Sequence, residues 1–316
     1  MAYCMASSLY DNFFQDRTVL ITGGAGFIGS TLAKKLFSLG AKVRILDDFS
    51  TGHASNIASL DIDVFEGSIL NETLLENSLL DCDCVFHLAA MVSVPASVED
   101  PQRCFEINTH GTQLILQHAS DLGVRRVLFA ASSSAYGPYA ALPSTESMVP
   151  DPVSPYAESK IAGEEAIRLC AKNSKTDSAS LRYFNIFGPT QDPHSQYAAV
   201  VAAFMEALVH QRNPQIYGDG SQTRDFTYID NAVHANLLAA SNAAPLSGEV
   251  FNIGTGSSYS LLEMLDAMSK AMNVTPVIDF HPMREGDVPH SRADISKAGI
   301  AFRYKPIVSF QEGISR

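Results

Sequence analysis

The most informative stretch of the chain is residues 18–29, TVLITGGAGFIG. Its apolar residues 19–22 predict a short buried strand, and the apolar spacing beyond Gly29 predicts a helix. Gly24, Gly26 and Gly29 fit G-x-G-x-x-G, and Gly23, Gly26 and Gly29 fit G-x-x-G-x-x-G. Such glycines permit a sharp strand-to-helix turn, a close approach of backbone N–H groups to a pyrophosphate, and tight packing of helix on sheet. The stretch therefore predicts a dinucleotide site.

Strands and helices alternate along the rest of the first half. We expect strands at residues 42–47, 63–66, 84–88, 126–131 and 180–185, and helices at 71–80, 104–122 and 157–173. Nearly continuous apolar strands separated by helices predict an α/β fold, a doubly wound parallel sheet with helices on both faces. After about residue 186 Pro, Gly, Asp and aromatic residues cluster, which predicts a smaller region over the ends of the sheet.

These patterns predict the domain organisation. We expect an N-terminal extension at residues 1–16 and a dinucleotide-binding Rossmann domain at 17–186, to which 226–256 returns. A smaller C-terminal α/β region that binds the substrate would consist of 187–225 and 257–316.

Composition excludes several kinds of protein. The 316 residues include 34 acidic and 22 basic side chains, a net charge of −12, which argues against nucleic-acid binding. The absence of a long apolar run argues against a membrane span, and residues 1–16 do not resemble a signal peptide. The five cysteines form no C-x-x-C pair, so we expect neither a disulfide framework nor a metal site, and a cytoplasmic location.

An acidic residue lies where a dinucleotide site needs one. Asp47 ends the second expected strand, 18 residues after Gly29. A carboxylate there can accept both ribose hydroxyls of NAD and would repel the 2′-phosphate of NADP, so NAD is favoured. The alternative is that Asp47 and Asp48 form a solvated turn.

Three further features suggest proton transfer. Tyr156 and Lys160 form Y-x-x-x-K, which places both on one helix face. The cationic lysine would favour a phenolate, which can take a proton from a hydroxyl while hydride leaves the same carbon. Ser132, Ser133 and Ser134 follow an expected strand, where ligands bind in such sheets, and can orient that hydroxyl. The alternatives are an ordinary exposed helix pair and a polar turn.

The sequence resembles the extended short-chain dehydrogenase/reductase family from about Arg17 onward. The motifs that carry the resemblance are TGGAGFIGS, HLAA (87–90), ASSSAYG (131–137), SPYAESK (154–160) and RYFNIFGP (182–189). SQTRDFTYIDN (221–231), FNIGTG (251–256) and REGDVPHSRADISKA (284–298) narrow it to nucleotide-sugar epimerases, most closely the group acting on UDP-N-acetylglucosamine. Dehydratases of this family carry Asp and Glu where this chain has Ser133 and Ser134, which argues against that activity.

The resemblance implies roles for particular residues. Ser132, Tyr156 and Lys160 would be catalytic. NAD would be bound by Gly23, Gly26, Phe27, Ile28, Asp47, Thr51, Gly52, Ser68, Ile69, Leu88, Ala89, Ala90, Asn108, Tyr156, Lys160 and Tyr183. Ser68 stands where relatives usually carry the Asp of Gly-Asp-Ile, and this departure weakens the expected adenine contact.

The UDP-sugar would be bound by a second set of residues. They are Ser93, Ser132, Ser133, Ser134, Asn185, Gln191, Tyr217, Arg224, Arg284, Asp287 and Ser291. Arg224 and Arg284 would hold the diphosphate by charge-assisted hydrogen bonds. Their alternative is an ion pair with Asp225 or Glu285.

The resemblance also suggests which sugar is bound. The small Ser291, at a gatekeeper position beside the hexose, and Gln191 would admit and bond a 2-acetamido group. Gln191 on a surface loop without a ligand role is the alternative. UDP-glucose and UDP-uronate 4-epimerases remain open, as does a catalytically silent NAD-bound protein. Relatives commonly form homodimers through the helices near 104–122 and 157–173.

Overall fold

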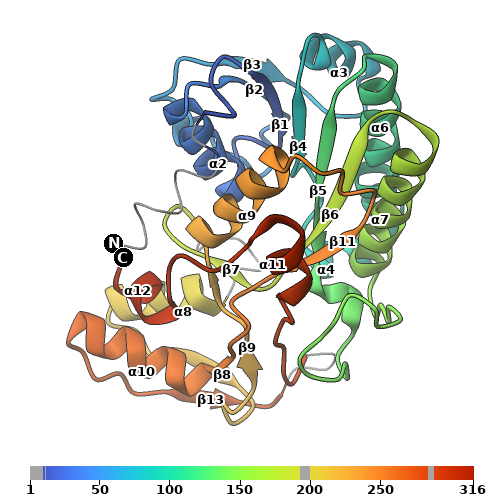
Figure 1. Cartoon of the computed structure of the whole chain (residues 1–316). Helices are drawn as coiled ribbons and strands as arrows, with labels where there is room; N and C mark the ends of the chain where they lie inside the picture. The colour runs from blue at the N-terminus through green and yellow to red at the C-terminus, as the bar shows by residue number, and fades with distance from the viewer. Residues whose placement is uncertain (1–9, 11, 193–199, 284–287) are drawn as a thin grey trace.

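A seven-stranded parallel sheet forms the centre of the protein (Figure 1). The structure is a computed structural model that describes residues 10, 12–192, 200–283 and 288–316. Its strands follow the order β11-β6-β5-β4-β1-β2-β3, and every neighbouring pair is parallel. Their bounds are β1 Thr18–Thr22, β2 Lys42–Asp47, β3 Asp63–Glu66, β4 Cys84–His87, β5 Arg126–Ser132, β6 Asp177–Tyr183 and β11 Val250–Ile253. The expected doubly wound sheet is confirmed.

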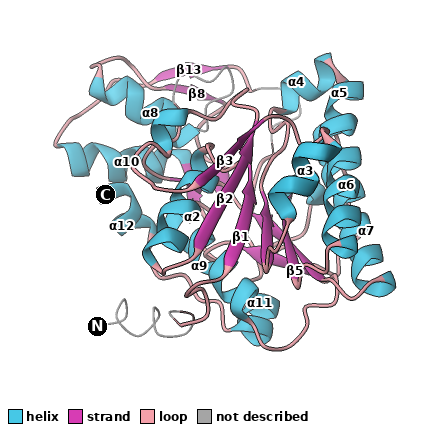
Figure 2. Ribbon diagram, turned by 90° about the horizontal axis from the view of Figure 1, so that it is seen from above, coloured by secondary structure: helices cyan, strands magenta, loops and turns pink. Residues whose placement is uncertain are grey.

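Helices cover both faces of this sheet (Figure 2). Helices α2 (Phe27–Ser38) and α9 (Ile229–Ser241) lie on one face, and α3 (Glu72–Leu79), α6 (Gly111–Asp121) and α7 (Pro155–Asn173) lie on the other. Successive strand residues point to opposite faces. Val19 and Ile21 accordingly join one hydrophobic core, and Leu20 joins the other. Burial on both faces explains why a central strand such as β1 reads as a nearly continuous apolar run.

The strand order reverses between β1 and β4. The chain moves outward from β1 to β2 and β3, then returns to place β4 on the other side of β1. Ligands of such sheets bind at this switch point, outside the carboxyl ends of the strands. The glycine loop after β1 and the HLAA segment at the end of β4 both lie there.

The smaller region is built from short helices and strand pairs. Its helices α8, α10 and α12 lie together away from the sheet (Figure 1). Phe204, Met264 and Phe310 belong to the same core cluster as Val19 of the sheet, so one apolar core is continuous through both regions. The elements that follow β6, apart from α9 and β11, are β7 Ile186–Phe187, α8 Val200–Val209, β8 Gln215–Tyr217, β9 Thr223–Arg224, β10 Thr227–Tyr228, β12 Tyr259–Ser260, α10 Leu261–Met272, β13 Asp279–His281, α11 Ser296–Phe302 and α12 Phe310–Ser315.

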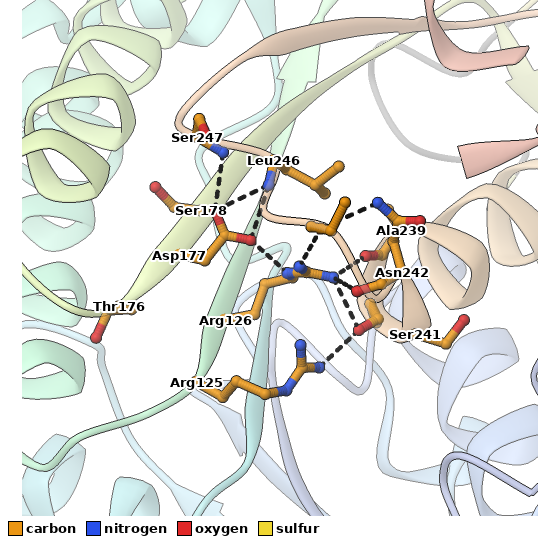
Figure 3. Close-up of polar contacts among 12 residues, drawn as sticks. Arg125, Arg126, Thr176, Asp177, Ser178, Ala239, Ser241, Asn242, Leu246 and Ser247 are labelled. Atoms are coloured by element: carbon orange, nitrogen blue, oxygen red, sulfur yellow. Dashed lines mark hydrogen bonds and ion pairs between the residues drawn. The ribbon is translucent and has the colours of Figure 1, made fainter. Parts of the chain in front are cut away.

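A buried arginine joins the sheet to α9 (Figure 3). Arg126, only 2% exposed at the start of β5, donates to Asp177 of β6 at 2.7 Å. Its guanidinium also donates to carbonyls at and beyond the end of α9, those of Ala239, Ala240, Asn242 and Ala244. Because the last carbonyls of a helix lack partners within it, Arg126 acts as a cap.

Residues before β1 contribute to the core. Tyr10 and Phe14 are buried against it, and the Tyr10 hydroxyl lies 3.3 Å from Nδ1 of His234 on α9. No helix in the described part of the chain has the length and apolar character needed to cross a membrane.

Candidate active site

The glycine loop lies against the end of β4. Gly23 has a φ of +70°, and a Cβ there would lie 2.7 Å from the backbone nitrogen of Ala89. Gly26 caps α2, and no side chain among the described residues accepts a hydrogen bond at this cap. The first N–H groups of α2 are therefore available to an anion, and Phe27 and Ile28 provide two of them. This loop fits the pyrophosphate of NAD.

Asp47 holds the loop in place from the end of β2. Its Oδ2 accepts from the backbone N–H of Ala25 at 2.8 Å, and its Oδ1 accepts from Phe49 at 2.9 Å. Burial raises the pKa of this carboxyl. Gly52 approaches so closely that a Cβ there would lie 3.1 Å from Oδ1. Each oxygen has further acceptor capacity, so Asp47 can still bind a ribose diol.

Asn108 fixes the segment that follows β4. Its amide accepts from Met91 N at 2.8 Å, and donates to Met91 O at 3.0 Å and to Ser159 Oγ of α7 at 3.0 Å. Asn108 lies in a π-helical turn, Glu106–His110, between α5 (Pro101–Phe105) and α6. The single helix expected at 104–122 is thus interrupted, as often happens at functional sites.

Tyr156, Lys160 and Ser132 meet beside this segment. Lys160 on α7 is 3% exposed; its Nζ donates to Ala130 O at 2.9 Å and lies 5.9 Å from the centre of the Tyr156 ring. Burial lowers the pKa of Lys160 to about 8. Burial also raises the pKa of Tyr156, and a hydrogen bond with Ser132 opposes that rise. The Ser132 hydroxyl in turn accepts from Ser134 Oγ at 2.9 Å.

This arrangement can perform proton transfer. The Ser132 hydroxyl, the Tyr156 phenol and the Lys160 cation converge at the carboxyl ends of β5 and β6. The glycine loop follows the carboxyl end of β1, so it lies at the same edge of the parallel sheet. Deprotonation of Tyr156 would create a negative charge next to the Lys160 cation, which stabilises it. Ser133 belongs to the 3-10 turn η4 (Ser133–Tyr136) that follows Ser132.

Two of the residues expected to bind the sugar, Asn185 and Ser291, lie together. A third, Gln191, has a side-chain oxygen that accepts no hydrogen bond from the described residues. Asn185, at the left-handed φ of +34°, donates to Ser291 Oγ at 3.3 Å. Gln191 donates to Ile186 O at 3.4 Å, while its buried Oε1 has no partner among the described residues. Tyr183, at the end of β6, accepts from Asn236 at 2.8 Å.

Other expected residues already have local contacts. Ser68 Oγ accepts from Leu70 N at 3.2 Å, and Ile69 is buried in the core. Ser93 caps α4 (Val94–Glu99) by accepting from Ala96 N at 3.1 Å. Thr51 lies in the exposed turn beside Gly52. Leu88 donates to Thr22 O at 3.0 Å and precedes Ala89 and Ala90.

The expected UDP contacts lie on the smaller region. Tyr217 of β8 stacks on His281 of β13 with ring centres 5.2 Å apart. Arg224 of β9 donates to Pro289 O at 3.3 Å. The Asp225 carboxylate accepts from Thr227, Thr255, Gly256 and Ala293, and within the described residues it forms no ion pair with Arg224. Arg284 and Asp287 lie outside the described residues.

The sequence did not reveal several polar residues that organise the site. Ser97 Oγ accepts from Tyr156 N at 3.1 Å, and Ser159 Oγ donates to Tyr156 O at 2.8 Å. His87 and Thr22 lie beneath the segment after β4. Of these residues, only His87 could have been suspected from the sequence. It ends an otherwise apolar buried strand, where a polar side chain must find hydrogen-bond partners.

Comparisons with known proteins identify the family. Residues 19–254 match the NAD dependent epimerase/dehydratase family. A UDP-glucose 4-epimerase of Mycolicibacterium smegmatis is 38% identical over 310 residues, covering 94% of this chain and 96% of the relative. The chain belongs to this family, and it is an NAD-dependent isomerase.

Two solved structures share the fold over nearly their whole length. The UDP-N-acetylglucosamine 4-epimerase of Methanobrevibacter ruminantium, in complex with UDP-N-acetylmuramic acid, superposes with a TM-score of 0.90 at 34% identity, covering 95% of this chain and 96% of that chain. The UDP-glucose 4-epimerase of Thermotoga maritima with UDP-glucose superposes with a TM-score of 0.89 at 35% identity, covering 94% and 96%. The chain is thus similar to UDP-sugar 4-epimerases.

Proposed function

We propose that this protein is a UDP-sugar 4-epimerase whose preferred pair is UDP-N-acetylglucosamine and UDP-N-acetylgalactosamine. The convergence of Ser132, Tyr156 and Lys160 supports the reaction. NAD, when bound, supplies reversible oxidation at C4 of the sugar. Tyr156 takes the proton of the 4-hydroxyl and later returns one, Ser132 orients that hydroxyl, and Lys160 stabilises the phenolate. Firm UDP contacts and sparse sugar contacts would let the 4-keto sugar turn.

The choice of the 2-acetamido sugar rests on Gln191 Oε1, which is buried and accepts no hydrogen bond from the described residues. A buried amide oxygen without a partner is unfavourable unless a ligand supplies a donor. The N–H of a 2-acetamido group is such a donor, and plain glucose lacks it. Ser291 is small, and it lies beside Asn185 where a large side chain would narrow the space.

UDP-glucose is the second candidate substrate. The Mycolicibacterium relative and the Thermotoga structure are both described as UDP-glucose 4-epimerases. A small gate admits glucose as well, so the two substrates must be compared directly.

The test measures kcat/KM of the purified protein for both UDP-sugars. We expect the acetamido sugar to be preferred, and Gln191→Ala to lower its kcat/KM about tenfold, the value of one lost hydrogen bond. UDP-glucose turnover should change less than twofold in that variant. Gln311→Ala, an exposed position on α12, is the matched control. Equal losses on both sugars would contradict the role of Gln191, and absence of turnover in the wild type would contradict the epimerase.

We also propose a homodimer formed by the outer faces of α6 and α7. These helices pack against each other, and Leu169 on α7 is 41% exposed. Sedimentation velocity on the purified protein tests the proposal, because a single monomeric species at micromolar concentration would contradict it.

A further inference from the structure

His87 is a buried titratable residue that the proposed reaction does not use. It is 1% exposed at the end of β4, and both ring nitrogens have partners. Nδ1 lies 2.8 Å from Thr22 Oγ1, and Nε2 lies 2.8 Å from Thr112 Oγ1. Thr22 and Thr112 are fully buried, so both hydrogen bonds are shielded from bulk solvent.

The neighbouring hydrogen bonds fix the direction of the whole series. Thr112 donates its hydroxyl proton to Asn108 O at 2.6 Å, so it must accept from His87 Nε2–H. A neutral His87 then accepts at Nδ1 from the Thr22 hydroxyl. Thr22 Oγ1 accepts in turn from the N–H of Ala89 at 3.3 Å. Every donor meets an acceptor only when the ring is neutral and its proton is on Nε2.

The series continues to the catalytic helix through Asn108. Its side chain donates to Ser159 Oγ at 3.0 Å, and Ser159 donates to Tyr156 O at 2.8 Å. The same side-chain amide accepts a hydrogen bond from Met91 N and donates one to Met91 O. Two runs of hydrogen bonds therefore meet at Asn108: one ends at its backbone carbonyl, and the other starts at its side-chain amide and reaches the backbone of Tyr156.

His87 also contacts the surroundings of Lys160. Its ring lies 5.4 Å from the Phe129 ring, and Lys160 Nζ lies 4.8 Å from the same ring centre. Burial, together with the Lys160 charge, lowers the pKa of His87 to about 3, which agrees with the neutral ring. A neutral imidazole adds no repulsion beside the lysine cation.

We propose that His87 is a positioning residue that sets the segment Leu88–Met91 and the Asn108 turn at one fixed distance from Tyr156 and Lys160. It touches neither substrate nor reacting atoms. Its loss would let the NAD-binding segment shift relative to the catalytic helix. The inference about turnover rests on the proposed function, whereas the effect on NAD retention does not.

The test uses full-length protein purified with its NAD. His87→Phe removes both ring hydrogen bonds, and Thr112→Val breaks the next bond while nearly keeping the side-chain shape. Thr112→Ser restores the hydroxyl. His234→Phe is the matched control, because His234 is also buried and bonds a hydroxyl, that of Tyr10, on the far side of the sheet. If His87→Phe does not fold, the Thr112 pair decides.

NAD is measured by titration and by the amount that acid releases per protomer, without any sugar. We expect His87→Phe and Thr112→Val to bind NAD about tenfold more weakly and to lower kcat about tenfold, as for one buried donor left unpaired. KM for the UDP-sugar should stay within twofold, and Thr112→Ser and His234→Phe should match the wild type. Wild-type NAD binding in His87→Phe and Thr112→Val would overturn the proposal, even if their melting temperatures fall. Absence of wild-type turnover would refute the proposed function alone.

Discussion

Replacing the buried lysine should stabilise this protein while it abolishes activity. Lys160 is 3% exposed, and burial lowers its pKa from 10.5 to about 8. At about 1.4 kcal/mol per pH unit, keeping this ammonium charged destabilises the folded state by about 3 kcal/mol at pH 7. Lys160→Met removes that cost and loses one hydrogen bond, to Ala130 O, worth about 1 kcal/mol. We therefore expect a net gain of about 2 kcal/mol.

The stability difference between the wild type and Lys160→Met should change with pH in a definite direction. Below about pH 8 Lys160 is protonated in both states, so the full cost is present. Above it the folded protein loses this proton while the unfolded chain keeps it up to about pH 10.5. The wild type therefore becomes relatively more stable as the pH rises, and the advantage of Lys160→Met should shrink between pH 8 and pH 10.5.

Urea unfolding at pH 7 and pH 9.5 measures both effects. NAD must be removed from each protein first, because ligand binding adds its own stabilisation. Lys172→Met, at an exposed position of the same helix, is the control and should change stability by less than about 0.5 kcal/mol. A less stable Lys160→Met at pH 7, or a difference that does not shrink at pH 9.5, would refute the argument.

Three further variants test the site and the fold. Tyr156→Phe should lower kcat at least 100-fold, roughly the value of a general base, and keep NAD, as turnover and acid release of the cofactor would show. Gly23→Ala should weaken NAD binding, measured by titration, because its φ is +70° and the new Cβ would lie 2.7 Å from Ala89 N; unchanged affinity would argue against this contact. Arg126→Met should cost about 3–5 kcal/mol of unfolding free energy, because Asp177 and four carbonyls lose their buried partner; urea unfolding measures this, and adding Asp177→Asn should recover part of the loss.

Periodicity predicted the sheet because its central strands, such as β1 and β4, are buried on both faces. The glycine loop and Asp47 also followed from local rules, since a strand-to-helix turn and a strand end both have sequence signatures. The left-handed turn at Asn185 and the π-turn at Asn108 did not, because each depends on contacts with distant segments. Asn108 needs Met91 and Ser159, and no spacing within the helix reveals either.

The contacts that organise the site were equally hidden. From the sequence alone, Ser93 could equally be a sugar contact or a helix cap. The structure shows that it caps α4. His87 was visible only as part of a motif. Its role depends on Thr22 of β1 and Thr112 of α6, which are 65 and 25 residues away and approach it only in the folded protein.

The edge strand β11 has a consequence for biosynthesis. It begins at Val250, and among the strands that the structure describes it pairs with β6 alone, which ends at Tyr183. A nascent chain that has left the ribosome up to β6 can pair β6 with β5 but leaves the other edge of β6 without a partner strand until the intervening segment has been translated. Unpaired edges of this kind recruit other chains. The protein should therefore depend on chaperones most during this interval, and a chain released just after residue 186 should aggregate.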